Sequence, residues 1–493
     1  MPGRSVSFRA GMASQAVAAA LVALLASAPA RAYDPATTHA GLTERAALAS
    51  SLHKVLTRRL GRPLGLLEPL QIHSRLLEPG ARRALWSRFE SLDPAGGYRP
   101  GVDGVAGALS WLVAGAVLAK TPPERGRNHF LDPRKRTGLD DRPGLTGVAH
   151  QLELTFDAGT SVRDLATGTA FDLTGKSSLD WIASPANDQG MPALLAAWER
   201  AVAAREPAER ESALVRALLA LGGILAVLED AGEPAHVRND FRASFLQRQG
   251  GGSWDRGSSY ERFVASRYGR VGLPPAQPPM RRPTLESYFT AADGQGLADR
   301  TQRRFFSEGT LPRDVLIDAS TSTRDVVGMA RESLLFPEPS LAELSLKEPG
   351  TPQHLVVDGR RVLGYVRDAD RVRFFLDNAV YADAARTLLP EVEGYAAGLL
   401  DHLLRAGVSL KAGGELAVTL EGVGSASNLT LQLFSEDDRG QRRPAPTTID
   451  LAALAAGRTV TIAPPAGARR VAVLVKGRDA AGDFVAVGEL PLE

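Results

Sequence analysis

The sequence predicts a mainly α-helical protein that ends in a small antiparallel β-sandwich. Between about residues 36 and 406, stretches rich in Leu, Ala and Arg recur with a helical period and are interrupted by Pro and Gly. After Gly407 the pattern changes to short alternating segments separated by Gly, Pro and Asp turns, which is typical of strands. Because 493 residues exceed what one hydrophobic core usually organises, we expect a leader at 1–32, a helical domain at 33–406 and an accessory β-sandwich at 407–493.

Six segments of the helical part have the spacing of helices. In the clearest one, 207–230, leucines recur three or four residues apart and form one apolar stripe. The stripe consists of Leu214, Leu218, Leu221, Leu225 and Leu228. The other segments are 38–60, 107–118, 191–204, 258–268 and 384–407. We expect long loops at about 122–148 and 270–285, which are rich in Pro, Gly and charge, and such loops often carry functional sites.

The C-terminal part contains short alternating segments of the kind that form a β-sandwich. They lie at 415–422, 428–435, 458–464, 469–477 and 484–492. These segments show no constellation of residues typical of catalysis. We therefore interpret this part as an accessory or packing module.

The N-terminal segment has the features of an export signal. Arg4 and Arg9 precede the apolar run AVAAALVALLASA, and ARA at 30–32 has the small-x-small pattern of a cleavage site. Cleavage there would leave Tyr33 as the first residue of a periplasmic or extracellular protein. The run is shorter than the roughly 20 residues of a membrane-spanning helix, and we expect no later segment to span a membrane.

The composition excludes some classes of partner and of stabilisation. The formal charge of +2 is nearly balanced, so no global basic field favours nucleic acid or an anionic membrane. The chain contains no cysteine, so an exported form cannot use disulfides. Core packing, with metal ions where they bind, must stabilise it.

The helix predicted at 207–230 ends in Asp230, and His236 follows across the sequence AGEP. The two residues are too far apart in sequence to share one face of a helix. If the helix ends near Gly232 and Pro234 redirects the chain, the carboxylate and the imidazole can bind neighbouring metal ions. An acidic helix end followed by a hydrogen-bonded loop histidine has the same spacing, so the spacing alone leaves both interpretations open.

Two more of the eight histidines have informative neighbours. His129 lies with Asp132 in the sequence RNHFLDP, which is equally typical of an ordinary turn. His39 comes just before a predicted helix and six residues after Tyr33. This proximity matters because the free amine of a new N-terminus is itself a possible metal ligand.

Four stretches of the chain, taken in order, resemble one known family. They are YDPATTHAGLTERA, GAVLAKTPPERGRNHFLDP, LGGILAVLEDAGEPAHVRND and GSSYERFV. They are similar to the zinc-dependent phospholipase C family of bacteria, whose fold is shared with fungal single-strand nucleases. The resemblance covers about residues 33–265, and EDAGEPAHVRND is its most specific part. It implies a helical domain whose cleft holds three zinc ions and hydrolyses phosphodiester bonds with a metal-activated water.

The resemblance also implies ligands for two of the three ions. In the family, one zinc is held by the amine and carbonyl of the first residue, by a histidine and by an aspartate, which match Tyr33, His39 and Asp230 here. The family typically has tryptophan at the first position, but its ligand atoms belong to the backbone, so tyrosine is compatible. The second zinc would use His236 and Glu261.

Three positions depart from the ligands of the family. Gly257 stands where the second zinc has a further histidine, one helical turn before the glutamate, and Asp255 is a possible substitute. For the third zinc, Lys120 and Ala226 stand where the family has an aspartate and a histidine. These departures put the third ion most in doubt.

The remaining ligands of the third ion are His129 and Asp230. An ammonium beside a zinc ion would be repelled. One hypothesis is that Lys120 occupies the cation position and neutralises Asp230, because a buried carboxylate without a cation is costly. The alternative is a rebuilt site in which Glu124, four residues after Lys120, supplies the carboxylate.

Two functions are compatible with these patterns. The first is an exported zinc phosphodiesterase with two or three ions and a metal-bound water near Asp230. The second is an inactive exported pseudoenzyme, with an incomplete cluster or no zinc, that acts as a binding or envelope protein. The choice between phospholipid and nucleic acid as substrate stays open: DPRKRTG near His129 would attract phosphate, whereas an aromatic content of 6% slightly disfavours base stacking. The sequence leaves the oligomeric state undecided.

Overall fold

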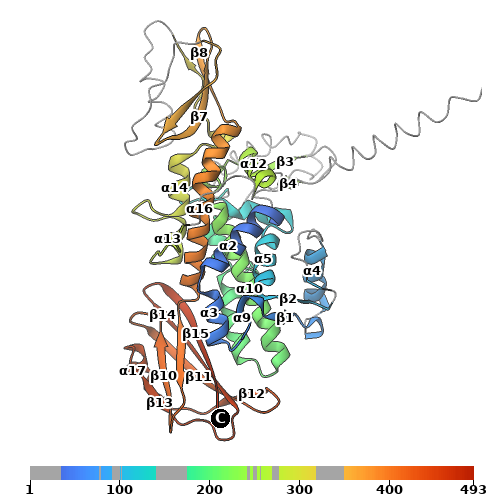
Figure 1. The fold of residues 1–493 in the computed structure, drawn as a ribbon, viewed down its shortest axis with the longest axis vertical. Helices are drawn as coiled ribbons and strands as arrows, with labels where there is room; N and C mark the ends of the chain where they lie inside the picture. The colour runs from blue at the N-terminus through green and yellow to red at the C-terminus, as the bar shows by residue number, and fades with distance from the viewer. Residues whose placement is uncertain are drawn as a thin grey trace, which may run out of the picture.

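Helix α10, Pro207–Asp230, runs through the middle of the described structure and organises the helices around it (Figure 1). The computed structural model describes residues 35–76, 79–90, 100–101, 103–139, 175–240, 245–247, 253–255, 257–268, 277–317 and 349–492. The helices packed against α10 are α2 (Ala40–Ala49), α5 (Ala108–Leu118), α9 (Met191–Ala203) and α16 (Asn378–Leu403). From Ser212 to Asp230, only Arg216 of this helix is exposed, so α10 is buried on all sides and not only along its leucine stripe.

The apolar character of α10 is explained by this burial. By length and composition alone the helix could cross a membrane, and the expectation that no later segment is apolar enough to span was wrong on that point. Within the fold, 89% of its most apolar window is buried. Glycines let α5 approach closely: a Cβ at Gly222 would lie 2.0 Å from the backbone oxygen of Leu112.

The helices predicted at 107–118, 191–204, 207–230, 258–268 and 384–407 correspond to α5, α9, α10, α12 (Ser259–Arg267) and α16. The segment predicted as one helix at 38–60 is instead broken. The π-helix η1 (Pro35–His39) leads into α2, and α3 (Leu52–Arg59) follows after a break. The break is fixed by Ser51, whose N and Oγ donate to Asp401 Oδ1 at 2.6 and 2.7 Å.

Shorter elements connect these helices. They are η2 (Gly65–Leu67), β1 (Pro69–Gln71), η3 (Ser74–Leu76), α4 (Pro79–Glu90), β2 (Val105–Gly107), η5 (Pro123–His129), α8 (Ser178–Ala183), η6 (His236–Arg238), β3 (Phe245–Gln247), β4 (Ser253–Asp255), α13 (Leu285–Phe289), α14 (Leu297–Arg304) and η7 (Glu308–Thr310). The loop predicted at 122–148 thus contains η5, and its part from 140 onward lies outside the described residues, as does 270–276 of the second predicted loop.

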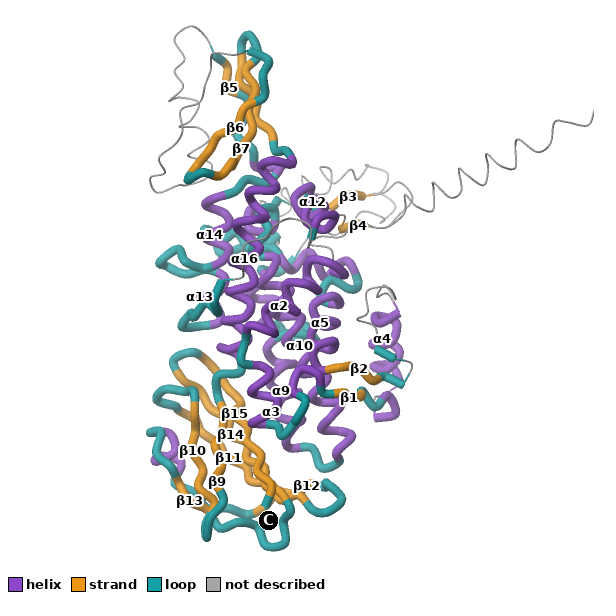
Figure 2. Tube along the Cα trace, in the orientation of Figure 1, coloured by secondary structure: helices purple, strands orange, loops and turns teal. Residues whose placement is uncertain are grey.

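A four-stranded antiparallel sheet interrupts the region that the sequence predicts to be helical. Its strands lie in the order β5 (Val315–Leu316), β8 (Arg371–Phe375), β7 (Arg360–Arg367), β6 (Gln353–Val357). The sheet projects beyond α16 at the end of the body opposite the C-terminal strands (Figure 2). Asp358 and Gly359 join β6 to β7 with φ of 48° and 75°, as a two-residue hairpin of type I′ requires. The helical prediction was wrong here, although Asp-Gly between alternating residues is a hairpin signal.

The C-terminal part consists of two antiparallel sheets, which confirms the predicted fold class. One has the order β13 (Val460–Ile462), β10 (Leu416–Glu421), β9 (Gly407–Lys411), and the other β12 (Arg442–Ala445), β11 (Ser427–Glu436), β14 (Arg470–Asp479), β15 (Gly482–Pro491), with the short helix α17 (Leu451–Ala455) beside them. Along β14, Val471 and Val473 belong to the core between the sheets, whereas Ala472 and Leu474 belong to the core of the helical body. Strand β14 is therefore buried on both faces of the second sheet.

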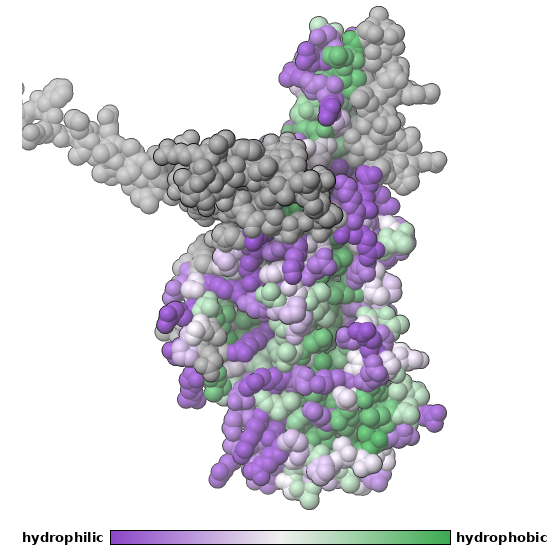
Figure 3. Space-filling model, turned by 180° about the vertical axis from the view of Figure 1, so that it is seen from behind, coloured by the Kyte–Doolittle hydropathy of each residue, from purple (hydrophilic) through white to green (hydrophobic). Residues whose placement is uncertain are grey.

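Polar contacts add to the junction between the strands and the helices. Arg442 Nη1 donates to the backbone oxygen of Val202 at 2.9 Å, and Lys476 Nζ lies 2.9 Å from Glu199 Oε1. On the rear face of the molecule, hydrophilic residues cover much of the described surface and apolar residues reach it between them (Figure 3). A surface of this mixed kind is usual for a folded chain of this composition.

Candidate metal centre

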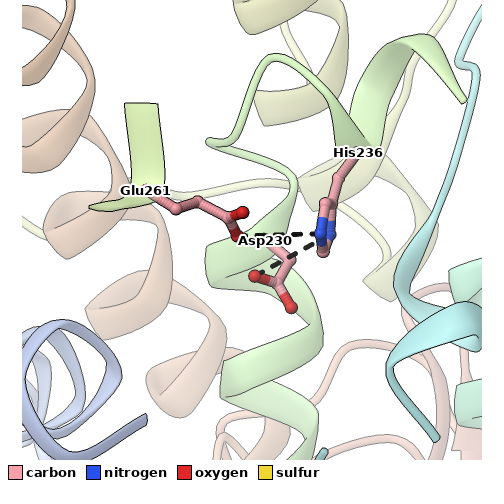
Figure 4. Close-up of side chains that lie close together, drawn as sticks. All are labelled: Asp230, His236 and Glu261. Atoms are coloured by element: carbon pink, nitrogen blue, oxygen red, sulfur yellow. Dashed lines mark ion pairs between the residues drawn. The ribbon is translucent and has the colours of Figure 1, made fainter. Parts of the chain in front are cut away.

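Three residues singled out from the sequence, Asp230, His236 and Glu261, meet at the C-terminal end of α10 (Figure 4). Asp230 is the last residue of the helix, and the turn through Pro234 brings His236 back toward it. Glu261 comes from the first turn of α12. All three are 0% exposed, and one ligand atom from each lies within 4.8 Å of the others.

The turn after α10 depends on a glycine and on a buried glutamate. A Cβ at Gly232 would lie 2.2 Å from Cγ2 of Val392 in α16, so only glycine lets the chain turn this close to the neighbouring helix. Glu233 Oε2 accepts a hydrogen bond from the backbone N of His236 at 2.7 Å. The two contacts fix the position from which the His236 ring projects.

The His236 ring lies between two carboxylates without bonding to either. Its Nδ1 is 3.8 Å from Asp230 Oδ1 and its Nε2 is 3.7 Å from Glu261 Oε1, and among the described residues neither nitrogen has a hydrogen-bond partner. These gaps are too long for hydrogen bonds. The gap between Nε2 and Glu261 Oε1 suits two ligands of one ion. Bonds of about 2.0–2.2 Å to a tetrahedral zinc place its ligands about 3.4 Å apart. Burial lowers the pKa of His236 well below its usual value, which favours the neutral imidazole that binds metals.

Glu261 is held so that one of its oxygens faces His236. Its Oε2 accepts from the backbone N of Ser258 at 2.5 Å, and its own N donates to Ser258 Oγ at 3.1 Å, which together form a capping box. Ser258 Oγ in turn donates to Glu233 Oε1 at 2.7 Å. Burial, and then the charge of Glu261, raise the pKa of Glu233 well above its usual value. A cation here would offset the negative charge that these two buried carboxyl groups carry when both are ionised.

On the other side of Asp230, both ring nitrogens of His39 face carboxylates. Nδ1 lies 2.5 Å from Glu229 Oε2 and Nε2 lies 3.3 Å from Asp230 Oδ1, while Thr43 Oγ1 donates to Glu229 Oε1 at 2.7 Å. Burial alone would lower the pKa of His39, but Asp230 and Glu229 outweigh burial and raise the pKa to about 9. The 3.3 Å gap between Nε2 and Asp230 Oδ1 suits two ligands of one zinc ion, with Glu229 holding Nδ1 on the other side of the ring. Tyr33, the other expected ligand, lies outside the described residues.

Lys120 and His129 complete the surroundings of Asp230. Lys120 Nζ donates to Asp230 Oδ1 at 2.9 Å, which is the ion pair that the sequence hypothesis requires, and His129 Nδ1 lies 2.6 Å from Asp230 Oδ2. Lys120 is only 6% exposed. Burial would raise the pKa of Asp230, but the charge of Lys120 leads the opposing contributions that hold this pKa well below its usual value. Asp230 is therefore anionic and paired with a protein cation.

The environment of Ala226 also disfavours an ion at the third position. Ala226 forms a small buried apolar cluster with Ala116 and Ala119. Methyl groups therefore occupy the position at which the sequence resemblance implies a histidine ligand. Together with the ammonium of Lys120, this cluster does not fit a third zinc.

The remaining expected ligands are placed only in part. Gly257 has a φ of 68°, a left-handed conformation that a histidine at this position would rarely adopt. The side chains of the proposed substitutes Asp255 and Glu124 lie outside the described residues. Sequence reasoning missed Glu229 and Glu233, although both lie in the stretch EDAGEPAH, and the run of acids there was the available signal.

The fold and the site define a helical protein with a buried histidine and carboxylate centre and with antiparallel sheets at its C-terminus. No protein-family model and no curated protein matches the chain. Among solved structures, the alpha toxin from Clostridium absonum is similar over 94% of this chain and 96% of that chain, with 12% sequence identity and a TM-score of 0.26. At this level of similarity, the description of the site rests on the geometry of the chain itself.

Proposed function

We propose that this chain is an exported hydrolase of phosphodiester bonds that binds a single zinc ion through His236 Nε2 and Glu261 Oε1. The observation that carries the proposal is the buried His236 ring, which has no hydrogen-bond partner in the described structure and lies 3.7 and 3.8 Å from two carboxylates. Buried polar groups are nearly always satisfied, and a cation would satisfy this one. The motifs along 33–265 support the reaction class, and the leader at 1–32 supports export.

The residues around His236 have separable roles in this proposal. The two nitrogens of one ring point in different directions, so binding through Nε2 leaves Nδ1 protonated. Asp230 Oδ1 lies 3.8 Å from Nδ1, so its negative charge faces the protonated nitrogen without a hydrogen bond. Lys120 keeps Asp230 neutralised where the family uses another metal ion. When bound, zinc offsets charge on the phosphoryl oxygens and makes a water molecule a better nucleophile.

A second candidate function is an inactive exported binding protein with the same ion in a structural role. Two observations favour it: the ion pair between Lys120 and Asp230, and the full burial of His236 and Glu261. Structural zinc sites are closed, whereas catalytic sites keep an open position for water or substrate. The two candidates therefore differ in turnover and not in metal binding.

The test combines metal analysis with activity on the chain that begins at Tyr33. We expect one zinc per chain after dialysis against a zinc-containing buffer, and no zinc in His236→Ala or Glu261→Gln. The matched control is His354→Ala, because His354 Nε2 also faces a carboxylate, Asp377 Oδ2 at 2.9 Å, but outside the centre. Hydrolysis is measured on bis(p-nitrophenyl) phosphate, phosphatidylcholine and single-stranded DNA.

Each outcome separates the candidates. Zinc together with hydrolysis that is lost in Glu261→Gln and kept in His354→Ala supports the enzyme. Zinc that depends on His236 and Glu261 without hydrolysis of any of the three substrates favours the binding protein. A folded chain that retains no zinc contradicts both.

A further inference from the structure

A cavity on the flank of the helical body uses none of the residues of the metal centre. It lies between α4, α9 and α10 and has a volume of about 490 Å³. Pockets for small ligands usually have volumes of about 300–1,000 Å³. The cavity is therefore large enough to hold a ligand, and its lining indicates what kind.

The walls of the cavity are mostly apolar. α9 contributes Ala193, Ala196 and Ala197, which lie on one face of the helix at a spacing of three and four residues. Leu85 from α4 and Leu219 from α10 face the same space. Because alanine side chains are short, this face of α9 leaves room that larger residues would fill.

One polar edge of the cavity is already neutralised by the protein. Asp188 Oδ2 lies 2.6 Å from Arg88 Nη1, and Asp188 Oδ1 lies 2.8 Å from Arg125 Nη2. Arg88 also donates to Gln189 Oε1 at 2.5 Å. Asp188, the one acidic residue that lines the cavity in the described structure, therefore pairs with Arg88 and Arg125 and not with the other arginines of the lining.

The other polar edge carries an excess of positive charge. Arg200 Nη2 has Glu209 Oε2 at 3.4 Å, a long contact between partly exposed groups. Arg216 is exposed and forms no ion pair with any residue in the described part of the chain. Burial, and then the nearby charge of Arg200, lower the pKa of Arg216. Two guanidinium groups, one with a long ion pair and one with none in the described structure, therefore line this apolar cavity.

We propose that this cavity binds an anionic amphiphile with a single hydrocarbon chain. The chain would lie against the alanine face of α9 and Leu219, where its burial is favourable. The head group, a carboxylate or a phosphate monoester, would lie between Arg200 and Arg216, because guanidinium groups bind both kinds of anion in a bidentate manner. A neutral or cationic amphiphile would form no ion pair with either arginine.

The test is displacement of 11-(dansylamino)undecanoic acid from the purified full chain by palmitate, dodecyl phosphate and hexadecanol. We expect both anions to displace the probe and hexadecanol to compete roughly tenfold more weakly. The double variant Arg200→Ala/Arg216→Ala should lower the affinity for both anions roughly tenfold and leave the affinity for hexadecanol unchanged. Arg58→Ala, an exposed arginine on α3, is the matched control and should bind like the wild type. Laurate is measured as a further competitor. The ratio of laurate to dodecyl phosphate, two anions with hydrocarbon chains of nearly equal length, distinguishes a carboxylate from a phosphate head group.

A second variant tests the cavity itself. Ala197→Phe should fill the space and abolish displacement by all three ligands, with folding checked by circular dichroism. Undiminished palmitate binding in a folded Ala197→Phe chain overturns the proposal, as does equal affinity for palmitate and hexadecanol or an absence of probe binding. His236→Ala should leave the affinities unchanged, so this result is independent of the metal centre.

Discussion

Two buried polar clusters, one between the helices and the C-terminal strands and one at the end of α10, differ in how many of their polar atoms have hydrogen-bond partners. At the junction, Arg442 Nε and Nη2 lie 2.7 and 2.8 Å from Glu436 and Glu489, and Nη1 donates to the backbone of Val202 at 2.9 Å. At the end of α10, neither ring nitrogen of His236 has a hydrogen-bond partner among the described residues. A buried network that satisfies itself is structural, whereas one that does not points to a missing ligand.

Within the cluster at the end of α10, Asp230 separates a side with short polar contacts from a side without them. On one side, Asp230 is contacted by Lys120 at 2.9 Å and by His129 at 2.6 Å, so its charge is neutralised without a metal. On the other side it faces His236 at 3.8 Å, too far for a hydrogen bond. The contrast places the protein cation Lys120 on one side of Asp230 and the unsatisfied ring nitrogens of His236 on the other.

The largest expected effect comes from breaking the complete cluster at the junction. Arg442→Met leaves Glu436 and Glu489, which are 15% and 8% exposed, without their main cation. Removing one partner of a buried ion pair costs about 3–5 kcal/mol in the free energy of unfolding. Urea denaturation followed by circular dichroism measures this loss. The control is Arg469→Met, whose exposed pair with Asp438 should contribute no more than about 1 kcal/mol; equal losses in the two variants would contradict the structural role of the junction.

Removing the ammonium group that pairs with Asp230 should lower the free energy of unfolding somewhat less. Lys120→Met keeps the apolar stem but removes the ammonium, so Asp230 loses its strongest cation while His39 remains. We expect a loss of about 3 kcal/mol in the free energy of unfolding, measured in EDTA. Lys54→Met, at an exposed position of α3, should be neutral. An unchanged unfolding curve in Lys120→Met would show that this ion pair does not stabilise the fold.

On the side of His236, we expect added zinc to raise the free energy of unfolding. At a free zinc concentration of about 100 times the dissociation constant, binding to the folded state should add about 2.7 kcal/mol to the free energy of unfolding. Glu261→Gln, which can still cap α12, should abolish this gain, while His354→Ala should keep it. Stabilisation of equal size in Glu261→Gln would place the ion elsewhere.

The sequence predicts the local parts of this architecture better than the clusters. α10 has the predicted bounds, Pro207–Asp230. They could be predicted because the apolar spacing and the end of a helix depend on residues that are neighbours in the sequence. The partnership of Glu229 with His39 joins residues 190 positions apart, and no local spacing indicates it. The junction of Arg442 with Glu489 is likewise a product of tertiary packing. Asp230 was identified because it ends a helix, whereas the division between its two sides required the positions of residues from four segments.

His402, a buried histidine away from both clusters, shows how burial changes the pKa of an imidazole. We expect its contribution to the free energy of unfolding to be the smallest of the four. His402 is 8% exposed near the end of α16, with its ring centre 5.4 Å from that of Tyr288. Burial, and then the charge of Arg405, lower the pKa of His402 from 6.5 to about 4. The unfolded chain therefore takes up a proton as pH falls below 6.5, and the folded chain does so only near pH 4.

The stabilisation of the neutral ring is accordingly complete above pH 6.5 and is lost as pH falls toward 4. Between pH 8 and pH 5 the wild type should lose about 2 kcal/mol more in free energy of unfolding than His402→Gln, measured by urea denaturation at each pH. His53→Gln, an exposed histidine on α3, should follow the wild type. Parallel curves for the wild type and His402→Gln would mean that burial does not keep this imidazole neutral, and would remove the reference against which the neutral His236 ring is compared.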